Sequence, residues 1–277
     1  MKTILILLFL TLLYSNSYQI VESFYNKTDK NIKIESLKKS YKKVKKNIKK
    51  KRIVKKDIKN ISKKRAKLVI IIDDISHKYQ LNIIKSLPFK VTPSIFPPSK
   101  MNMNSNKLAK GLKHYMVHLP LQSNSKAMNK MHKTIFVADS NKKIEARVAE
   151  IKKLFPTVKF INNHTGSVFS KNYNKCKVLY KALDKYGIKF VDSRTTKFTQ
   201  FKKIAKEFHK RYYKNNHFID NIIDTKQILK EIIRGITIAK KRGYAIIIGH
   251  PHKQTFKALK MAKKYLNNID VVYIDEL

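Results

Sequence analysis

Short apolar runs, each followed directly by polar residues, recur along the chain from residue 68 onward. The first run, Leu68–Ile72, has five aliphatic residues without a polar break and leads into Asp73 and Asp74. A continuous run of this kind, rich in isoleucine and valine, predicts a strand buried on both faces. The same pattern predicts further strands at residues 91–96, 115–117, 158–161, 188–191, 218–219 and 245–248.

Between these runs, apolar residues recur at helical spacing and predict helices at residues 142–154, 173–186, 228–239 and 255–266. Gly187 stands where the second of these helices would end. Strands that alternate with helices predict a parallel sheet, either doubly wound or closed into a barrel. Seven or eight strands in about 210 residues suit a barrel, complete or slightly incomplete. No glycine-rich phosphate loop follows the first strand, which disfavours the doubly wound sheet.

The two aspartates at the end of the first strand indicate a polar site. Side chains alternate along a strand, so Asp73 and Asp74 are expected to point in different directions unless the strand ends between them. A buried carboxylate without a partner is costly, which implies a cation, a substrate or a turn with water at this point. A turn or a helix cap is the structural alternative.

Five of the polar clusters have a distinctive order and spacing: Ile71–Asp74, Met116–Leu121, Asn162–Ser167, Asp192–Thr196 and Gly249–His252. Together they resemble the motifs of the divergent polysaccharide deacetylases, over roughly residues 67–277. The resemblance implies an α/β fold for this segment, a distorted seven-stranded (β/α) barrel of the polysaccharide deacetylase type. It also implies metal-dependent removal of acetyl groups from a polysaccharide in the periplasm or cell envelope.

Hydrolysis of an amide at neutral pH needs an activated water and stabilisation of the oxyanion, and a divalent metal supplies both. One carboxylate and two histidines form a usual catalytic zinc set, and Asp74, His118 and His164 are the candidates. Asp73 is then the expected base, and His250 the expected acid that protonates the departing amine. A satisfied core histidine is the alternative for His118.

Other residues are assigned supporting roles. Asp192 and Arg194 are expected to orient the base and acid as an ion pair, although a structural salt bridge explains them as well. Asn163, Asp220 and His252 are candidates for substrate binding, with loop or turn formation as the alternative. If residues 113–119 form a strand, His114 and His118 lie about 13 Å apart and cannot share one metal ion.

The first residues are typical of an export signal. One lysine precedes Ile4–Leu13, which is apolar apart from Thr11, and polar residues follow. Ten residues are too few to span a bilayer comfortably, so residues 1–21 are interpreted as a signal peptide or an uncleaved N-terminal anchor. Export to the periplasm, or anchoring in the inner membrane facing it, is expected. The single cysteine, Cys176, excludes an internal disulfide.

A formal net charge of +44 is concentrated partly in residues 22–66, a lysine-rich linker expected to be disordered or partly helical. This arm is expected to contact an anionic envelope surface, unless it is a charged linker without a fixed partner. Export makes nucleic acid an unlikely partner.

Three hypotheses follow. The first is a metal-dependent hydrolase that removes acetyl groups from an envelope polysaccharide or peptidoglycan-type glycan, with zinc as the expected metal. The second is a catalytically inactive deacetylase-like protein that binds glycan or an envelope partner. The third is a basic nucleic-acid-binding protein. Convergence of Asp74, His118 and His164 on one point is the geometric requirement of the first hypothesis.

Overall fold

The computed structural model describes residues 65–277. The expected signal or anchor at 1–21 lies outside the described residues, as does the lysine-rich linker at 22–66 apart from its last two residues. Within the described part of the chain, no helix is long and apolar enough to cross a membrane.

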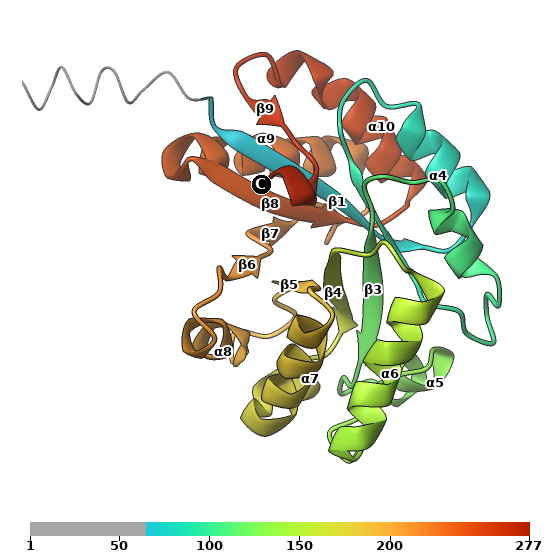
Figure 1. Cartoon of the computed structure of the whole chain (residues 1–277). Helices are drawn as coiled ribbons and strands as arrows, with labels where there is room; N and C mark the ends of the chain where they lie inside the picture. The colour runs from blue at the N-terminus through green and yellow to red at the C-terminus, as the bar shows by residue number, and fades with distance from the viewer. Residues whose placement is uncertain (1–64) are drawn as a thin grey trace, which may run out of the picture. The chain divides into compact units, whose positions relative to one another are not determined.

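A single parallel sheet forms the centre of the described unit (Figure 1). Its strands pair in the order β6-β5-β4-β3-β2-β1-β8-β7, and β9 pairs with the start of β1. The sheet curls, but β6 and β7 at its two ends do not pair with each other among residues 65–277, so the barrel stays open there. The strands are β1 (Lys67–Ile75), β2 (Thr92–Ile95), β3 (Met116–Leu121), β4 (Phe160–Thr165), β5 (Lys189–Asp192), β6 (Tyr213–Lys214), β7 (His217–Phe218), β8 (Tyr244–Gly249) and β9 (Asp270–Val271).

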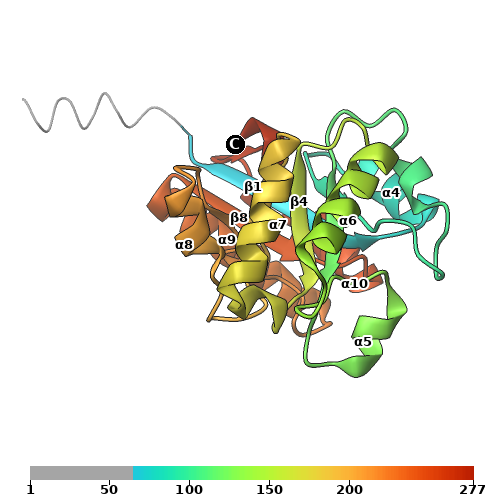
Figure 2. The same cartoon turned by 60° about the horizontal axis from the view of Figure 1, so that its bottom comes forward.

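Helices cover the outer face of the curled sheet (Figures 1 and 2). The four predicted helices are confirmed as α6, α7, α9 and α10, whereas α4, α5 and α8 are shorter and were not predicted. The α-helices are α4 (Lys78–Lys85), α5 (Lys126–Met131), α6 (Asn141–Leu154), α7 (Tyr173–Lys185), α8 (Phe201–Glu207), α9 (Thr225–Arg242) and α10 (Lys253–Ala262); the 3-10 turns are η1 (Ser105–Ala109), η2 (Phe169–Lys171), η3 (Lys263–Tyr265) and η4 (Ile274–Glu276).

Local signals in the sequence explain where several helices begin and end. The side chains of Ser140, Asn172 and Asp224 accept hydrogen bonds from backbone N–H groups in the first turns of α6, α7 and α9. Helix α9 ends at Gly243, whose φ of 84° is a left-handed conformation that glycine adopts at low cost. Gly187, at φ 66°, follows the end of α7 as predicted.

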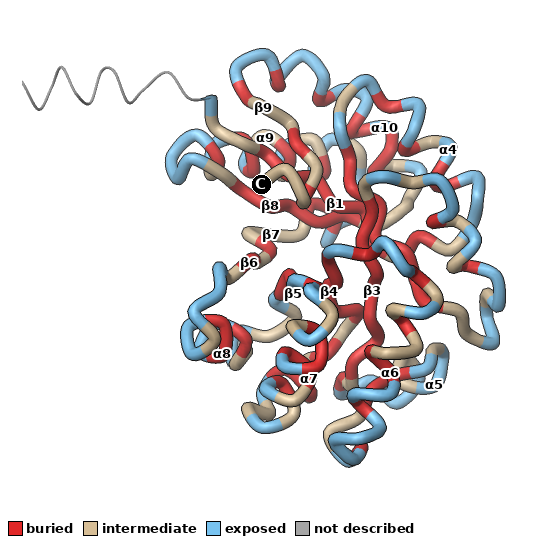
Figure 3. Tube along the Cα trace, in the orientation of Figure 1, coloured by how far each residue is buried: buried red, intermediate tan, exposed pale blue. Residues whose placement is uncertain are grey.

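Alternation along the strands builds two apolar cores, and the strands at the centre of the sheet are mostly buried along their length (Figure 3). In β1, Leu68, Ile70 and Ile72 pack outward against the helices, while Val69 and Ile71 face the interior of the curled sheet. All five side chains are fully buried. The predicted strand with two buried faces is therefore confirmed, and so is the (β/α) barrel fold, which has six strands of four or more residues and three of only two.

The C-terminal segment fills the interior at the N-terminal ends of the strands. Ile274 packs into the inner core, and its backbone N–H donates to Thr92 Oγ1 at 3.1 Å. Beside it, Asp275 Oδ1 lies 2.9 Å from His114 Nδ1. His114 therefore belongs to this end of the barrel, which confirms that it does not share a site with His118.

Candidate functional site

The inward positions of the strands become polar at their C-terminal ends. In β1 the inward series Val69 and Ile71 continues to Asp73. Inward Met116 is followed two residues later by His118, and inward Ile248 by His250. In β4 the series runs from inward Phe160 to Asn162 and His164. Because parallel strands end at the same side, these polar groups meet at one mouth of the barrel.

Asp74 reaches the same mouth by a different route. Strand alternation would turn it away from Asp73, but its φ of 57° is left-handed and interrupts the alternation. The left-handed residue breaks the regular strand geometry at this point, which is the kind of exception that the sequence analysis allowed for, and both aspartates line the same cavity. Such a conformation costs a non-glycine residue on the order of 1–3 kcal/mol and is typical of functional sites. Thr165, the last residue of β4, and Arg194, two residues after β5, share it.

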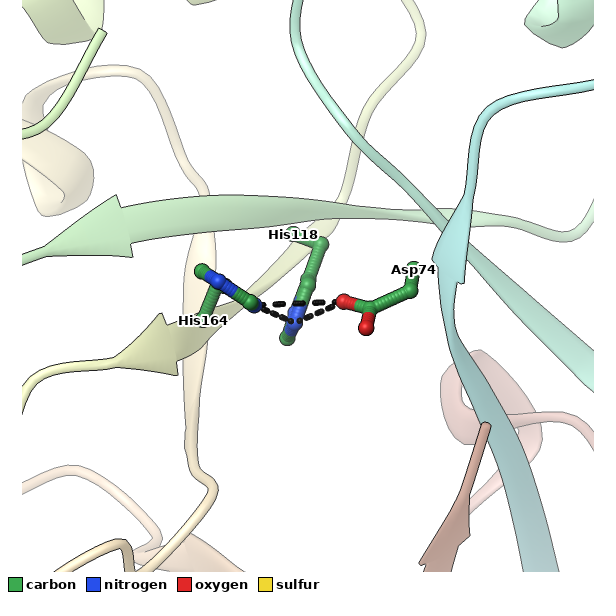
Figure 4. Close-up of side chains that lie close together, drawn as sticks. All are labelled: Asp74, His118 and His164. Atoms are coloured by element: carbon green, nitrogen blue, oxygen red, sulfur yellow. Dashed lines mark hydrogen bonds and ion pairs between the residues drawn. The ribbon is translucent and has the colours of Figure 1, made fainter. Parts of the chain in front are cut away.

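Asp74, His118 and His164 converge (Figure 4). Asp74 Oδ1 lies 3.2 Å from His118 Nε2 and 3.1 Å from His164 Nδ1, and the two histidine nitrogens are 3.2 Å apart. Ligands placed tetrahedrally at zinc–nitrogen and zinc–oxygen bond lengths are about 3.3 Å from one another. The three donor atoms thus have nearly the spacing of one face of a zinc coordination tetrahedron.

The hydrogen bonds of Asn162 determine which ring nitrogen of His118 faces Asp74 and His164. The Asn162 amide nitrogen donates to both oxygens of Asp73, at 2.8 and 3.0 Å, so its oxygen faces His118 Nδ1 at 2.9 Å and Ser94 Oγ at 2.6 Å. His118 Nδ1 must therefore carry a proton, which directs Nε2 toward Asp74 and His164. One carboxylate oxygen and two imidazole nitrogens at this spacing form a donor set that fits a divalent metal ion.

The charges of the triad respond to this geometry. Burial alone would raise the pKa of Asp74, but hydrogen bonds and charge from His118 and His164 hold it well below its ordinary value. Burial lowers the pKa of His164, and the neighbouring charge of His118 lowers it further. An ionised carboxylate and a neutral imidazole are the forms that bind a metal.

Asp73 lies directly behind the triad. It is 1% exposed, and its Oδ2 is 3.6 Å from His118 Nδ1. Burial raises the pKa of its carboxyl group, while the charges of His118 and His250 act in the opposite direction. A buried carboxylate whose pKa is raised is suited to accept a proton as a general base.

His250 lies on the other side of the mouth and is held by Asp220. Its Nδ1 is 3.0 Å from Asp220 Oδ1, its backbone N–H donates to Asp220 Oδ2 at 2.5 Å, and Thr255 Oγ1 donates to the same oxygen at 3.0 Å. Although burial lowers the pKa of His250, the hydrogen bond and charge of Asp220 raise it to about 9. His250 is therefore protonated at neutral pH and able to act as an acid.

Two cavities of about 300 Å³ and 290 Å³ meet at this mouth. Asp74, His164 and His250 line both. The first extends under Phe96, His132 and His252, and the second past Ser193, Thr195 and Asn221. An extended ligand that crosses the triad has space on either side of it.

Comparison with known proteins identifies the family. Residues 70–277 match the family described as divergent polysaccharide deacetylase. The chain belongs to the divergent polysaccharide deacetylase family.

The chain is also similar to two bacterial proteins in sequence and to a solved structure in fold. The chain is 28% identical to the uncharacterized protein YibQ of Escherichia coli (strain K12) over 196 residues, covering 70% of this chain and 61% of YibQ. It is 28% identical to an uncharacterized protein of Haemophilus influenzae over 203 residues, covering 73% and 72% of the two chains. The crystal structure of the uncharacterized protein ATU2773 from Agrobacterium tumefaciens C58 shares the fold, with a TM-score of 0.68, 15% identity and coverage of 78% and 90%.

The divergent deacetylase motifs account for the triad, for Asp73 and for His250, which the structure brings together. Asp192 does not join them. Val191 faces inward, so Asp192 faces the helices, where its carboxylate accepts hydrogen bonds from the Tyr212 hydroxyl at 2.6 Å and the Arg194 backbone N–H at 2.8 Å. Among residues 65–277, no ion pair within 4 Å joins the Asp192 carboxylate and the Arg194 guanidinium. The orienting contacts predicted for this pair are made by Asn162 and Asp220 instead.

The three predicted substrate residues differ in their surroundings. Both ends of the Asn163 amide are used, because its nitrogen donates to Thr165 O at 2.6 Å and its oxygen accepts from Ser193 N at 2.9 Å. Asp220 is 6% exposed and holds His250. These contacts indicate structural and positioning roles. His252 lines the first cavity, so a substrate contact stays the prediction for it.

Asn162 is the functional residue that the sequence analysis did not identify. Its only signal in the sequence is its place two residues before His164, on the same face of the strand.

Proposed function

We propose that this protein is a metal-dependent hydrolase that removes acetyl groups from an envelope polysaccharide. One observation carries the proposal: an Asp–His–His triad with metal-ligand spacing lines one cavity together with a buried carboxylate, Asp73, and a histidine whose pKa is raised, His250. Membership in the divergent polysaccharide deacetylase family supports a glycan substrate. Peptidoglycan-type glycan, zinc as the metal, and an exported periplasmic or membrane-anchored location are parts of the proposal.

Asp74, His118 and His164 would hold the metal. When bound, a divalent metal supplies Lewis acidity toward water and toward the acetyl carbonyl. Two nitrogen ligands and one carboxylate favour zinc among the common divalent ions.

Asp73 and His250 divide the proton transfers between them. Asp73 takes a proton from the attacking water, whose oxygen forms a new bond to the acetyl carbon. Asn162 keeps the Asp73 carboxylate in place and ionised by donating to both of its oxygens. As the C–N bond breaks, His250 gives a proton to the departing amine, so the products are acetate and the free amino sugar.

The test combines metal content with acetate release. Purified protein is expected to contain about one zinc ion per chain, to lose it in Asp74→Ala, and to retain it in Asp184→Ala, which removes a carboxylate of α7 remote from the site. Acetate release from N-acetylated glycan oligomers is expected for the intact protein but not for Asp73→Asn. A protein that takes up no zinc contradicts the proposal. Zinc and glycan binding without acetate release would favour the inactive, glycan-binding alternative.

A further inference from the structure

Exposed apolar side chains gather around the mouth of the barrel. Of the nine large apolar side chains that are exposed among residues 65–277, seven lie on segments that directly follow strands β1, β2, β3, β5 and β7. Parallel strands all end at the mouth, so these segments lie around the two cavities. The seven are Tyr79, Met101, Met103, Met131, Phe198, Ile222 and Ile223, called the mouth ring below.

The contacts of neighbouring residues place the ring at the cavities. Met101 and Met131 line the first cavity themselves. Thr195, three residues before Phe198, and Asn221, next to Ile222, line the second. Exposed fractions of 58% for Phe198 and 64% for Ile222 are high for side chains of this kind, and several exposed apolar side chains around one mouth are typical of an interaction site.

The charge around the ring is positive and unpaired. Exposed lysines directly precede four ring members: Lys78, Lys100, Lys130 and Lys197. None of these four forms an ion pair with a carboxylate in the described part of the chain. Among residues 76–79, 96–103, 122–131, 193–198 and 219–224, the only exposed acidic residue is Asp224, whose carboxylate caps α9.

We infer that the mouth ring docks onto an anionic lipid bilayer. Apolar side chains that alternate with lysines are the chemistry of interfacial binding: the former enter the boundary between headgroups and acyl chains, and the latter contact anionic headgroups. Phe198 shows both parts at once, because Lys197 Nζ and Lys171 Nζ lie 5.1 Å and 5.6 Å from the centre of its ring. The ring residues do not belong to the lysine-rich segment 22–66, and the inference does not depend on catalysis.

The chain contains no tryptophan, so a single introduced tryptophan reports the environment of one chosen position. The full chain is prepared with Phe198→Trp or Ile222→Trp in the ring. Tyr265→Trp is the control, because Tyr265 is one of the two large exposed apolar residues outside the ring among residues 65–277 and lies in η3, beyond the far end of α10. Each protein is mixed with phosphatidylglycerol vesicles or with phosphatidylcholine vesicles.

On phosphatidylglycerol vesicles, the emission of the two ring variants is expected to shift to shorter wavelength and to be quenched by brominated acyl chains. The control is expected to show neither effect, even if the N-terminal arm holds all three proteins on the vesicles. Much weaker effects are expected on phosphatidylcholine. Unchanged emission in both ring variants, or equal shifts in ring and control variants, would overturn the inference. Met103→Trp serves as a third reporter if one ring variant does not fold.

Discussion

One buried amide, Asn162, sets the hydrogen bonding of two site residues at once. It donates to Asp73 and accepts from His118, so its loss would leave Asp73 without its donor and release the His118 ring from one orientation. We expect Asn162→Leu to weaken zinc binding by about 10- to 100-fold, the usual effect of removing a residue that orients a metal ligand. Competition with a chelator of known affinity measures this. Ser193→Ala, which removes only the 3.2 Å contact to the same amide, is the control.

His250 offers a second test at the residue scale. The Asp220→Asn variant removes the charge that raises the pKa of His250 while burial, which lowers it, remains. The pKa of His250, measured by NMR titration of its ring, is expected to fall well below about 9. Because His250 acts in its protonated form, activity should disappear as pH rises through this pKa, and the alkaline limit should move to lower pH in the variant.

The raised pKa of His250 also makes the free energy of unfolding depend on pH, in the same direction as the activity. A histidine whose pKa is raised by folding stabilises the protein fully below its unfolded pKa of about 6.5, and this contribution is lost as pH rises through about 9. Thr255→Val removes a hydrogen bond to Asp220 without removing charge, so it should leave the pKa of His250 nearly unchanged. Equal changes in the pKa of His250 in Asp220→Asn and Thr255→Val would show that the charge of Asp220 does not raise this pKa.

Residue roles could be predicted from the sequence only where they depend on neighbours in the chain. The triad, Asp73 and His250 come shortly after apolar runs in the sequence, so position alone indicates a shared mouth. The role of Asn162 depends on register, because His118 lies opposite Asn162 in the β3–β4 pairing. Likewise Asp192 faces the helices because its inward neighbour is Val191. Periodicity within one strand does not determine register between strands.

At the scale of elements, long apolar patterns were sufficient to predict a helix or strand, and short ones mostly were not. Helix α9 has 18 residues and a clear apolar face, whereas α5 has six residues and none is buried. Strands β6 and β7 have two residues each; an apolar pair at residues 218–219 predicted β7 within one residue, whereas no pattern predicted β6. Their places depend on pairing with β5 and β8. Such elements form because tertiary contacts hold them, which local sequence does not encode.

The packing of α9 on β8 depends on a missing side chain. A Cβ atom at Gly235 would lie 2.7 Å from Ile247 Cγ2 in the core. Alanine is a better helix former than glycine by about 1 kcal/mol, but overpacking a core typically costs about 1–3 kcal/mol. We expect Gly235→Ala to lower the free energy of unfolding by about 1 kcal/mol in urea denaturation. Thr237→Ala, exposed on the same helix, should leave it unchanged or raise it; a stabilising Gly235→Ala would contradict the close contact.

At the scale of the whole molecule, charge is the dominant feature. Residues 65–277 contain 43 lysines and arginines against 14 aspartates and glutamates, a formal net charge of +29. Exposed ion pairs such as Lys133–Glu150 and Lys210–Asp184 contribute only about 0–1 kcal/mol each. Repulsion among the excess positive charges therefore outweighs them and destabilises the compact state.

Sodium chloride screens this repulsion, since the Debye length falls from about 30 Å at 0.01 M to about 10 Å at 0.1 M. Thermal unfolding is thus expected to move to higher temperature over this range, by about 2–4 °C for each kcal/mol regained. A control series in which sucrose is added in place of sodium chloride, at constant ionic strength, separates screening from general solute effects. A Tm that falls with salt would mean that the ion pairs, and not the excess charge, control stability.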